Sequence, residues 1–259
     1  MSDPVHDAAR NAEPDVVSQR YLGGSYAARN PTWDREDSPW KAVQVCKALD
    51  AAGLRPRRIA EVGCGAGGVL LELAAAMPQA ELSGFDISPD AERFWKDHGN
   101  PRVAFRRSDF LDADTGHYDL ILLLDVIEHL ANPHSFLERI RGRASYFVFH
   151  IPLDLTALTV LRESPLLHVR AKVGHLHYYT RGLALALLEE CGLDVMLWHY
   201  TGAGLQAPQR SLRARLAALP RRLLSLASRD LSARLLGGET LIVLARPLAD
   251  PATRKTAAT

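Results

Sequence analysis

The sequence has few of the features that mark secreted, membrane-spanning or metal-cluster proteins. Its three cysteines, Cys46, Cys64 and Cys191, are odd in number and far apart, which argues against a disulfide framework or a zinc cluster and suits a reducing compartment. No apolar run approaches the length of a membrane span, and the first twenty residues are polar, without the apolar core of a signal peptide. We therefore expect a cytoplasmic protein.

An excess of charge of either sign is also missing. The chain has 31 lysines and arginines against 30 acidic residues, a net charge of +1 at pH 7, so no global field draws it to DNA or to a membrane. One local basic stretch, 209–234, carries seven arginines and one acid among leucines. We expect it to form cap helices. Contact with an anionic membrane or a lipid-linked substrate is the alternative, and RNA is disfavoured because no RNA-binding module accompanies it. The oligomeric state is not predicted.

The sequence does contain a regular alternation of short apolar strands and helices. Strands are expected at 58–62, 81–87, 103–108, 119–125, 145–151, 193–200 and 240–246. Helices are expected at 38–52, 67–76, 89–97, 133–141 and 180–190. Apolar strands that alternate with helices predict a parallel sheet covered on both faces. The predicted fold class is therefore α/β, with a mostly parallel sheet.

We expect one main domain over residues 37–247. A flexible N-terminal segment and lid, 1–36, precedes it, and a disordered tail, 248–259, follows it. Two stretches, about 153–173 and 206–236, do not fit the alternation. They are expected to be helical cap insertions beyond the carboxyl ends of the strands, where α/β sheets place their ligand-binding loops.

A glycine-rich turn follows the first expected strand, over the seven residues from Glu61 to Gly67. A strand, a glycine turn and a helix in this order suit a nucleotide-like ligand. Glu61 lies two residues before Gly63, where its carboxylate would repel a diphosphate. It suits a ligand that is cationic at that end, such as S-adenosylmethionine with its amino group and sulfonium.

Acidic residues also follow the next two strands. Asp86 ends the second strand and can accept hydrogen bonds from both hydroxyls of a ribose. Asp109 follows the third strand and can accept from the exocyclic amine of adenine. Ile87 or Phe110 can cover the adenine ring.

Together with the segment from Asp125 to Leu130, these motifs resemble the class I S-adenosylmethionine-dependent methyltransferases, over residues 39–247. The resemblance implies a Rossmann-like seven-stranded sheet whose last strand in sequence is antiparallel. It also implies transfer of a methyl group from S-adenosylmethionine to a small-molecule acceptor by in-line displacement. A hydroxyl is favoured as the acceptor group over a nitrogen or a carbon. The residues expected to bind the cofactor are Glu61, Gly63, Cys64, Gly65, Gly67, Asp86, Ile87, Asp109, Phe110 and Asp125.

Three histidines are candidate general bases on the acceptor side: His129, His150 and His175. His150 ends the fifth strand and is expected at the rim of the pocket. His175 belongs to a histidine-rich segment before a helix. Tyr21 and Trp33 are candidates to line or cover the pocket. The alternative for each of these residues is plain packing.

A divalent metal is a further alternative. If residues 125–129 are helical, Asp125, Glu128 and His129 share one face. The motif is similar to that of the small-RNA 2'-O-methyltransferases and ubiquinone-pathway O-methyltransferases, with Asp125 where those families have Glu. The resemblance implies a possible ligand set of Asp125, Glu128, His129 and His175, but the favoured prediction is no metal.

Two other functions use the same glycine spacing. One is an NAD-dependent oxidoreductase, against which Glu61 and Asp109 count. The other is a non-catalytic cofactor-binding module that keeps the fold without turnover.

Overall fold

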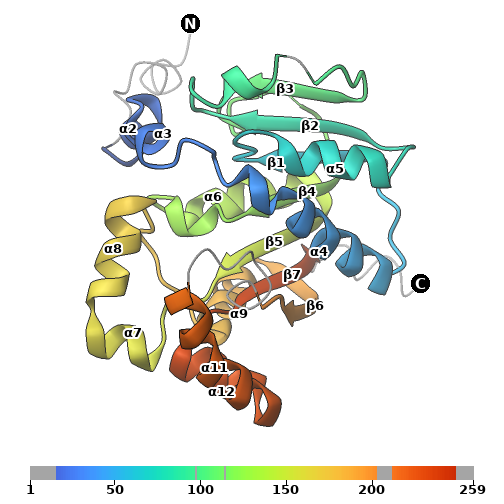
Figure 1. Cartoon of the computed structure of the whole chain (residues 1–259). Helices are drawn as coiled ribbons and strands as arrows, with labels where there is room; N and C mark the ends of the chain where they lie inside the picture. Colours follow the sequence, from blue (N-terminus) through green and yellow to red (C-terminus); the bar gives the residue numbers. More distant parts are fainter. Residues whose placement is uncertain (1–15, 97, 114, 203–211, 249–259) are drawn as a thin grey trace, which may run out of the picture.

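The computed structural model describes residues 16–96, 98–113, 115–202 and 212–248. Within them, seven strands form one sheet in the order β3-β2-β1-β4-β5-β7-β6 (Figure 1). The strands are β1 (Arg58–Val62), β2 (Glu81–Asp86), β3 (Val103–Arg107), β4 (Tyr118–Leu124), β5 (Ala144–Pro152), β6 (Leu193–Tyr200) and β7 (Thr240–Pro247). The pairs among β1 to β5 are parallel, and β7 runs antiparallel to β5 and β6. The predicted fold is confirmed.

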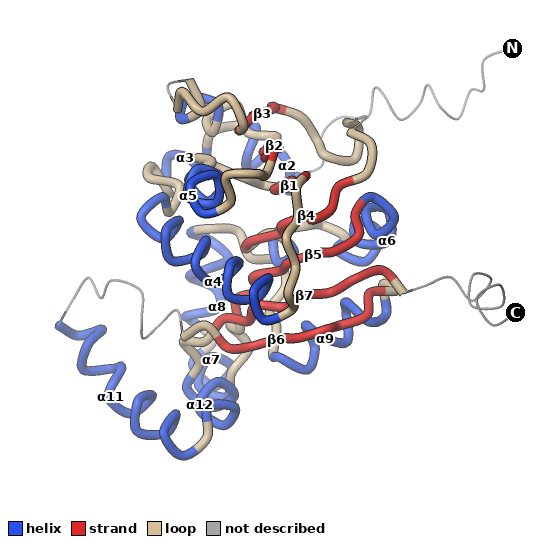
Figure 2. Tube along the Cα trace, turned by 90° about the vertical axis from the view of Figure 1, so that its right-hand side faces the viewer, coloured by secondary structure: helices blue, strands red, loops and turns tan. Residues whose placement is uncertain are grey.

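Helices cover both faces of the sheet (Figure 2). The helices α4 (Ser38–Ala51) and α5 (Gly68–Ala76) pack on one face, and α6 (Pro133–Ile140) and α9 (Arg181–Glu190) pack on the other. The apolar run of β4 serves both layers. Leu120 and Leu122 face α4 and α5, whereas Ile121 and Leu123 face α6 and α9, because successive side chains of a strand point to opposite faces.

The helix expected over residues 89–97 is wrong. The structure has turns there and one short 3-10 helix, η2 (Glu92–Phe94); residue 97 lies outside the described residues. Trp95 explains the difference. Its indole Nε1 donates to the carbonyl of Gly65 at 2.9 Å, and its ring stacks on Phe105. These tertiary contacts decide the backbone, since local helix propensity is only a weak preference.

Four short helices form caps beside the sheet. The first insertion contains α7 (Ala157–Arg162) and α8 (Ser164–Lys172), and the second contains α11 (Leu212–Ala227) and α12 (Arg229–Leu236). The part of the second insertion at 206–211 lies outside the described residues. No helix in the described ranges combines the length and the apolar character needed to cross a membrane.

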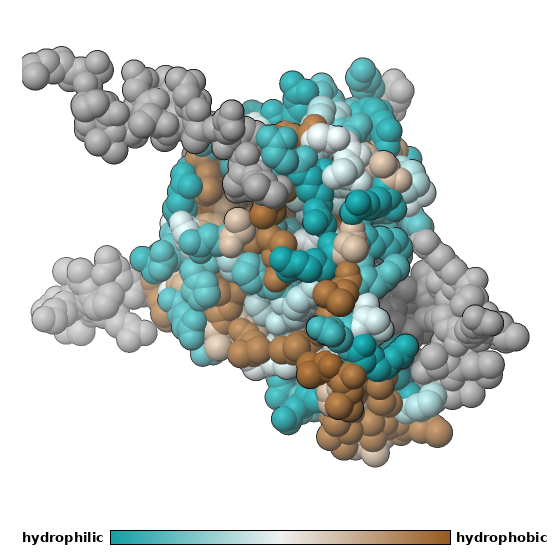
Figure 3. Space-filling model, turned by 90° about the vertical axis from the view of Figure 1, so that its left-hand side faces the viewer, coloured by the Kyte–Doolittle hydropathy of each residue, from teal (hydrophilic) through white to brown (hydrophobic). Residues whose placement is uncertain are grey.

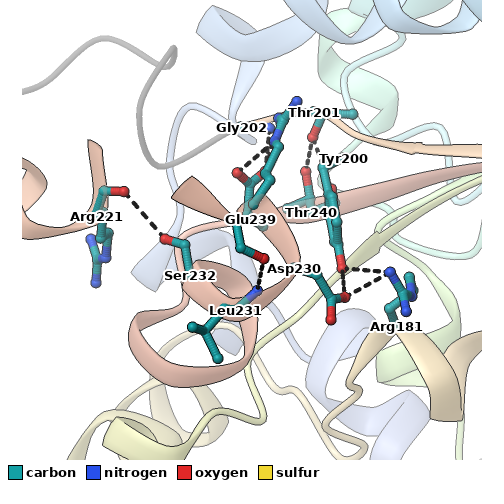
Figure 4. Close-up of polar contacts among 12 residues, drawn as sticks. Arg181, Tyr200, Thr201, Gly202, Arg221, Asp230, Leu231, Ser232, Glu239 and Thr240 are labelled. Carbon is teal, nitrogen blue, oxygen red and sulfur yellow. Dashed lines mark hydrogen bonds and ion pairs between the residues drawn. The ribbon is translucent and has the colours of Figure 1, made fainter. Parts of the chain in front are cut away.

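Polar contacts fasten α12 to the end of the sheet (Figure 4). Glu239, which precedes β7, accepts from Arg229 Nε at 2.9 Å and from the backbone N–H of Gly202 at 2.7 Å. Asp230 accepts from the hydroxyl of Tyr200 at 2.6 Å and pairs with Arg181 at 2.6 Å. The second insertion is therefore held by buried and half-buried hydrogen bonds as well as by apolar packing.

Candidate active site

One cavity of about 680 Å³ lies at the carboxyl ends of β1, β2, β4 and β5. Every residue that the sequence singled out for cofactor binding, catalysis or metal binding lines it. Residues of the N-terminal segment line it as well: Val17, Ser18, Tyr21, Tyr26, Trp33 and Asp34. The structure therefore brings the candidate residues together in one place.

The glycine loop between β1 and α5 turns through left-handed backbone. Gly63 and Gly65 have φ angles of 67° and 50°, which side chains other than glycine rarely adopt. A Cβ at Gly63 would lie 3.0 Å from Val126, and one at Gly65 would lie 3.1 Å from Trp33. The loop therefore offers bare backbone to a ligand in the cavity.

Glu61 places a buried acid at the start of this loop. Its side chain is 4% exposed, and its Oε2 has no hydrogen-bond partner. Burial raises the pKa of Glu61 to about 8, although Lys41 opposes that rise. A buried carboxyl oxygen without a partner carries a large desolvation cost. It fits a cationic group of a ligand, as the ammonium of S-adenosylmethionine is.

The next two acids differ in their surroundings. Asp86 is buried and accepts from the backbone N–H groups of Ser88 and Gly65 at 2.8 and 2.9 Å, which fixes its carboxylate beside the loop. Asp109 is exposed and accepts from the backbone N–H of Leu111 at 2.8 Å. Both retain lone pairs for a ligand, so their positions agree with the expected contacts to ribose and adenine.

Of the two candidates to cover adenine, Ile87 is the better placed. Ile87 is half-buried at the cavity wall. Phe110 is only 1% exposed and packs edge-on against Phe85 in the core, with ring centroids 5.1 Å apart. Cys64 is also buried, so its contribution to the loop comes from its backbone. The geometry thus assigns Phe110 and the Cys64 thiol to packing.

Asp125 is the centre of a charged network. One carboxylate oxygen lies 2.7 Å from Lys41 Nζ, and the other lies 2.6 Å from His150 Nδ1. Burial favours a raised pKa for Asp125, but His150 and Lys41 outweigh it and hold this pKa well below its usual range. The backbone of Asp125 has a φ of 57°, a strained conformation for a residue with a side chain.

The expectation for His150 is corrected by its surroundings. His150 lines the cavity as the sequence predicts, but its side chain is 3% exposed and both ring nitrogens are engaged. Nδ1 bonds Asp125, and Nε2 lies 2.8 Å from the hydroxyl of Thr240. A histidine with no free nitrogen does not serve as a general base, so the geometry favours a positioning role for His150.

Lys41 is the functional residue that sequence reasoning missed. It lies in the first half of α4, in phase with the buried residues Val45 and Ala48, so its side chain shares their inward face. The helical spacing of Lys41 relative to these apolar residues could have predicted a cation on the inward face of the helix. Its partner Asp125 is 84 positions away and could not be inferred from spacing.

A second cluster lies in the same cavity, beyond Asp125. Residues 127–129 form a single 3-10 turn, η3 (Ile127–His129), instead of the α-helical turn considered for Asp125, Glu128 and His129. Ligand atoms of Glu128, His129 and His175 all lie within 4.8 Å of one another. Asp125 is not in this group, because Lys41 and His150 hold it. The four-residue metal set is therefore corrected to three residues.

Backbone hydrogen bonds bring His175 to this cluster. The N–H groups of Leu176 and His177 donate to the carbonyl of Glu128 at 2.8 and 3.1 Å. The ring of His175 is oriented by Asp154, whose Oδ2 lies 2.6 Å from Nδ1. The cluster is thus assembled from η3 and the segment that follows α8.

The cluster leaves polar atoms without partners. Glu128 is fully buried and neither of its carboxyl oxygens has a hydrogen-bond partner, and burial followed by the charge of Asp125 raises its pKa well above the usual range. The Nδ1 atom of His129 is buried and unpartnered too. Burial, followed by the charge of His175, lowers the pKa of His129 to about 4. His129 is therefore neutral at neutral pH.

The N-terminal segment crosses the cavity. It contacts both the cofactor half, which contains the glycine loop and Asp86, and the acceptor half, which contains Glu128, His129 and His175. It forms α2 (Val16–Leu22) and α3 (Ser25–Arg29); residues 1–15 lie outside the described ranges. The ring of Tyr21 stands edge-on to His129, and its carbonyl accepts from Ser88 Oγ at 3.0 Å. Arg20 donates to the carbonyl of Arg170 at 2.8 Å and Arg29 donates to that of Ala171, both on α8. The segment therefore spans from β2 to the first insertion.

Comparison with known proteins agrees with this architecture. A family model described as a methyltransferase domain matches residues 40–197. The chain is 30% identical over 149 residues to the ubiquinone biosynthesis O-methyltransferase of Alkalilimnicola ehrlichii, covering 52% of this chain and 57% of that protein. It is 32% identical over 114 residues to the ajmaline N-methyltransferase of Rauvolfia serpentina, covering 39% of each. The chain spans about half the length of the first curated relatives that it matches.

The fold is also found among solved structures. The methyltransferase in complex with the Trm112 activator of Haloferax volcanii superposes with a TM-score of 0.62 at 16% identity, covering 91% of this chain and 99% of that chain. The sheet order, the antiparallel β7 and the acidic glycine loop define the class I, Rossmann-like methyltransferases.

The chain belongs to the methyltransferase domain family, whose model covers more than half of it. This match confirms the predicted methyltransferase family and favours it over an NAD-dependent oxidoreductase.

Proposed function

We propose that the enzyme methylates a hydroxyl group of a small-molecule acceptor, with His129 as the general base. The observation that carries the proposal is the state of His129: a neutral, buried imidazole whose Nδ1 has no partner, in the same cavity as the glycine loop. The similarity to ubiquinone biosynthesis O-methyltransferases supports an oxygen acceptor. The chain is also similar to an N-methyltransferase, so similarity alone does not choose between an oxygen and a nitrogen acceptor. The choice of oxygen therefore depends on His129.

The cofactor half of the cavity matches the two ends of S-adenosylmethionine. Glu61 would receive the ammonium of its methionine part, and Lys41 would face the carboxylate, so the pair recognises a zwitterion. Asp86 would accept from the ribose and Asp109 from adenine, with Ile87 on the ring. When bound, the cofactor supplies a methyl group on a sulfonium, which is already a good leaving group.

The acceptor half must orient the hydroxyl, take its proton and exclude water. His129 Nδ1 would accept the hydroxyl proton as the oxygen–methyl bond forms and the sulfur–methyl bond breaks. Because the pKa of His129 is about 4, the ring is in its neutral form, which can accept a proton, throughout the neutral range. Tyr21, edge-on to the same ring, would keep water from the reacting atoms.

Replacement of His129 tests this assignment. We expect His129→Ala to lower kcat by about 10²–10⁴-fold on a panel of phenols and catechols, while the affinity for S-adenosylhomocysteine stays unchanged in calorimetry. His134→Ala is the matched control, since His134 is exposed and pairs with Glu190 at the surface. Full turnover by His129→Ala would reject the base, and the family assignment would stand.

A metal-assisted reaction is the second candidate, because Glu128 is a fully buried acid with both oxygens unpartnered. Glu128, His129 and His175 offer one carboxylate and two imidazoles, a donor set that suits a divalent transition metal. A bound ion would supply Lewis acidity toward the acceptor hydroxyl. Exhaustive chelation followed by addition of Mn²⁺ or Zn²⁺ separates the two candidates: loss and recovery of turnover supports the metal, and unchanged turnover rejects it.

A further inference from the structure

The cap helices carry an unusual concentration of exposed aliphatic side chains. Of the thirteen exposed large hydrophobic residues in the described ranges, seven lie on α7, α8, α11 and α12. The most exposed are Leu226 at 86%, Leu161 at 85% and Leu223 at 70%. On the face of the molecule that carries α7 and α8, hydrophobic residues gather at its lower end (Figure 3).

Six of these residues lie on three helices that pack in one group, α7, α11 and α12; the outward side of these helices is here called the cap surface. Leu223 and Leu226 are three positions apart and lie on the same side of α11; Val160 and Leu161 are adjacent on α7. The helices α11 and α12 pack together, and α12 contacts α7. Arg221 Nε donates to the carbonyl of Leu236, and Ser232 Oγ donates to that of Arg221. The leucines are therefore presented by a fixed framework.

The cap surface and the neighbouring α8 are also strongly basic. The four helices contain nine lysines and arginines and a single acid, Asp230, which is paired with Arg181. Exposed cations lie directly beside the exposed leucines, with Arg222 next to Leu223 and Arg162 next to Leu161. Protruding aliphatic groups flanked by cations suit a surface that is apolar inside and anionic outside.

Other occupants fit this chemistry less well. A second copy of the chain would bring two basic surfaces together, so like charges would oppose the contact. Single-stranded nucleic acid is bound through stacking on aromatic rings, and the four helices contain no phenylalanine, tyrosine or tryptophan.

We propose that the cap surface docks onto an anionic lipid bilayer, with its leucines in the acyl boundary and its arginines at the headgroups. Such docking is peripheral. The proposal concerns binding alone and does not depend on the acceptor or base proposed above.

Flotation of the full chain with vesicles tests this docking. We expect binding to phosphatidylcholine vesicles that contain phosphatidylglycerol, much weaker binding to phosphatidylcholine alone, and release by salt. The double variant Leu223→Ser with Leu226→Ser should weaken binding by at least about tenfold. Arg222→Gln and Arg234→Gln should each weaken it about fivefold.

Matched variants outside the cap surface serve as controls. Leu183→Ser removes a leucine that is 52% exposed on α9, and Lys96→Gln removes an exposed cation near η2. Both should bind vesicles as the unchanged chain does, and all variants should keep the same affinity for S-adenosylhomocysteine, which reports an intact fold. No binding to anionic vesicles overturns the proposal, as does equal loss in the controls. Dimerisation or RNA binding that the leucine variants abolish, without vesicle binding, also overturns it.

Discussion

Asp125 and Glu128 are three positions apart and line the same cavity, yet their surroundings are opposite. Asp125 has a cation on one carboxylate oxygen and an imidazole on the other. Glu128 is more deeply buried and has a hydrogen-bond partner on neither oxygen. Their pKa values consequently move in opposite directions, down for Asp125 and up for Glu128.

The difference separates two kinds of acid in one motif. Asp125 is satisfied by the protein itself and ties α4, β4 and β5 together, so it stabilises the cavity wall. Glu128 bears the cost of burial without a hydrogen bond to either oxygen, which is typical of a group that awaits a ligand. Proximity in sequence therefore does not imply a shared role.

The largest effect is expected for Asp125→Asn. The substitution leaves the Lys41 cation without a counter-ion and His150 Nδ1 without an acceptor anion. We expect a loss of about 2–4 kcal/mol in the free energy of unfolding, measured by urea denaturation. Asp50→Asn is the control, because the Asp50–Arg55 pair at 3.0 Å is exposed and should contribute less than about 1 kcal/mol. Equal effects of the two variants would remove the structural role of Asp125.

Glu61 is a third buried acid in this cavity, and we propose above that it binds the ammonium group of S-adenosylmethionine. We expect Glu61→Gln to weaken S-adenosylhomocysteine binding by about 10–100-fold, as loss of a charge-assisted hydrogen bond does. The pKa of Glu61 is about 8 in the free protein, so cofactor binding below pH 8 must release a proton. Affinity should therefore rise with pH and level off above about pH 8.

Calorimetry in buffers of different protonation enthalpy measures that proton. Glu61→Gln should show no such release, and Glu72→Gln, an exposed position on α5, should behave as the unchanged enzyme does. Binding that is independent of pH between 6 and 8 would show that the ammonium is bound elsewhere.

The smallest effect is expected for Glu128→Gln, and it should depend on pH. The raised pKa means that Glu128 is most stable in its protonated form, so the unchanged protein loses stability as pH rises above the ordinary value of 4.5. Glutamine avoids that loss. The variant should match the parent at acidic pH and exceed its unfolding free energy at pH 8.

Thermal unfolding at several pH values checks this, with Glu138→Gln, exposed on α6, as the control. A variant that is less stable at every pH would mean that Glu128 is ionised and paired. Added Mn²⁺ or Zn²⁺ should stabilise the parent and not Glu128→Gln if the cluster binds metal.

Sequence alone predicted the sheet and the common location of Glu61, Asp86 and Asp109. Each of Glu61, Asp86 and Asp109 directly follows or ends a parallel strand, and such strand ends meet at one edge of a sheet. Their common location therefore follows from strand prediction. Among the expected helices, the one at 89–97 is wrong, because the contacts of Trp95 with the glycine loop and Phe105 outweigh local preference.

The acceptor half could be predicted only in part. Its composition was visible, but the grouping of Glu128 and His129 with His175, without Asp125, depends on a 3-10 turn and on backbone bonds from Leu176 and His177. The pairing of Lys41 with Asp125 joins segments 84 residues apart. Such contacts are set by packing of the whole domain, which spacing along the chain does not encode.

The network around Asp125 has a consequence for the direction of its hydrogen bonds. A carboxylate only accepts, so Lys41 and His150 Nδ1 must both donate to it. When His150 is neutral, its Nε2 has only a lone pair to offer, and the hydroxyl of Thr240 must donate to it. The direction of each hydrogen bond from Thr240 on β7 through His150 and Asp125 to Lys41 on α4 is then determined, and the donors on both sides point toward the carboxylate of Asp125. An amide at position 125 would turn its donor either toward Lys41, which cannot accept, so that bond would be lost, or toward His150 Nδ1, where the bond would be reversed.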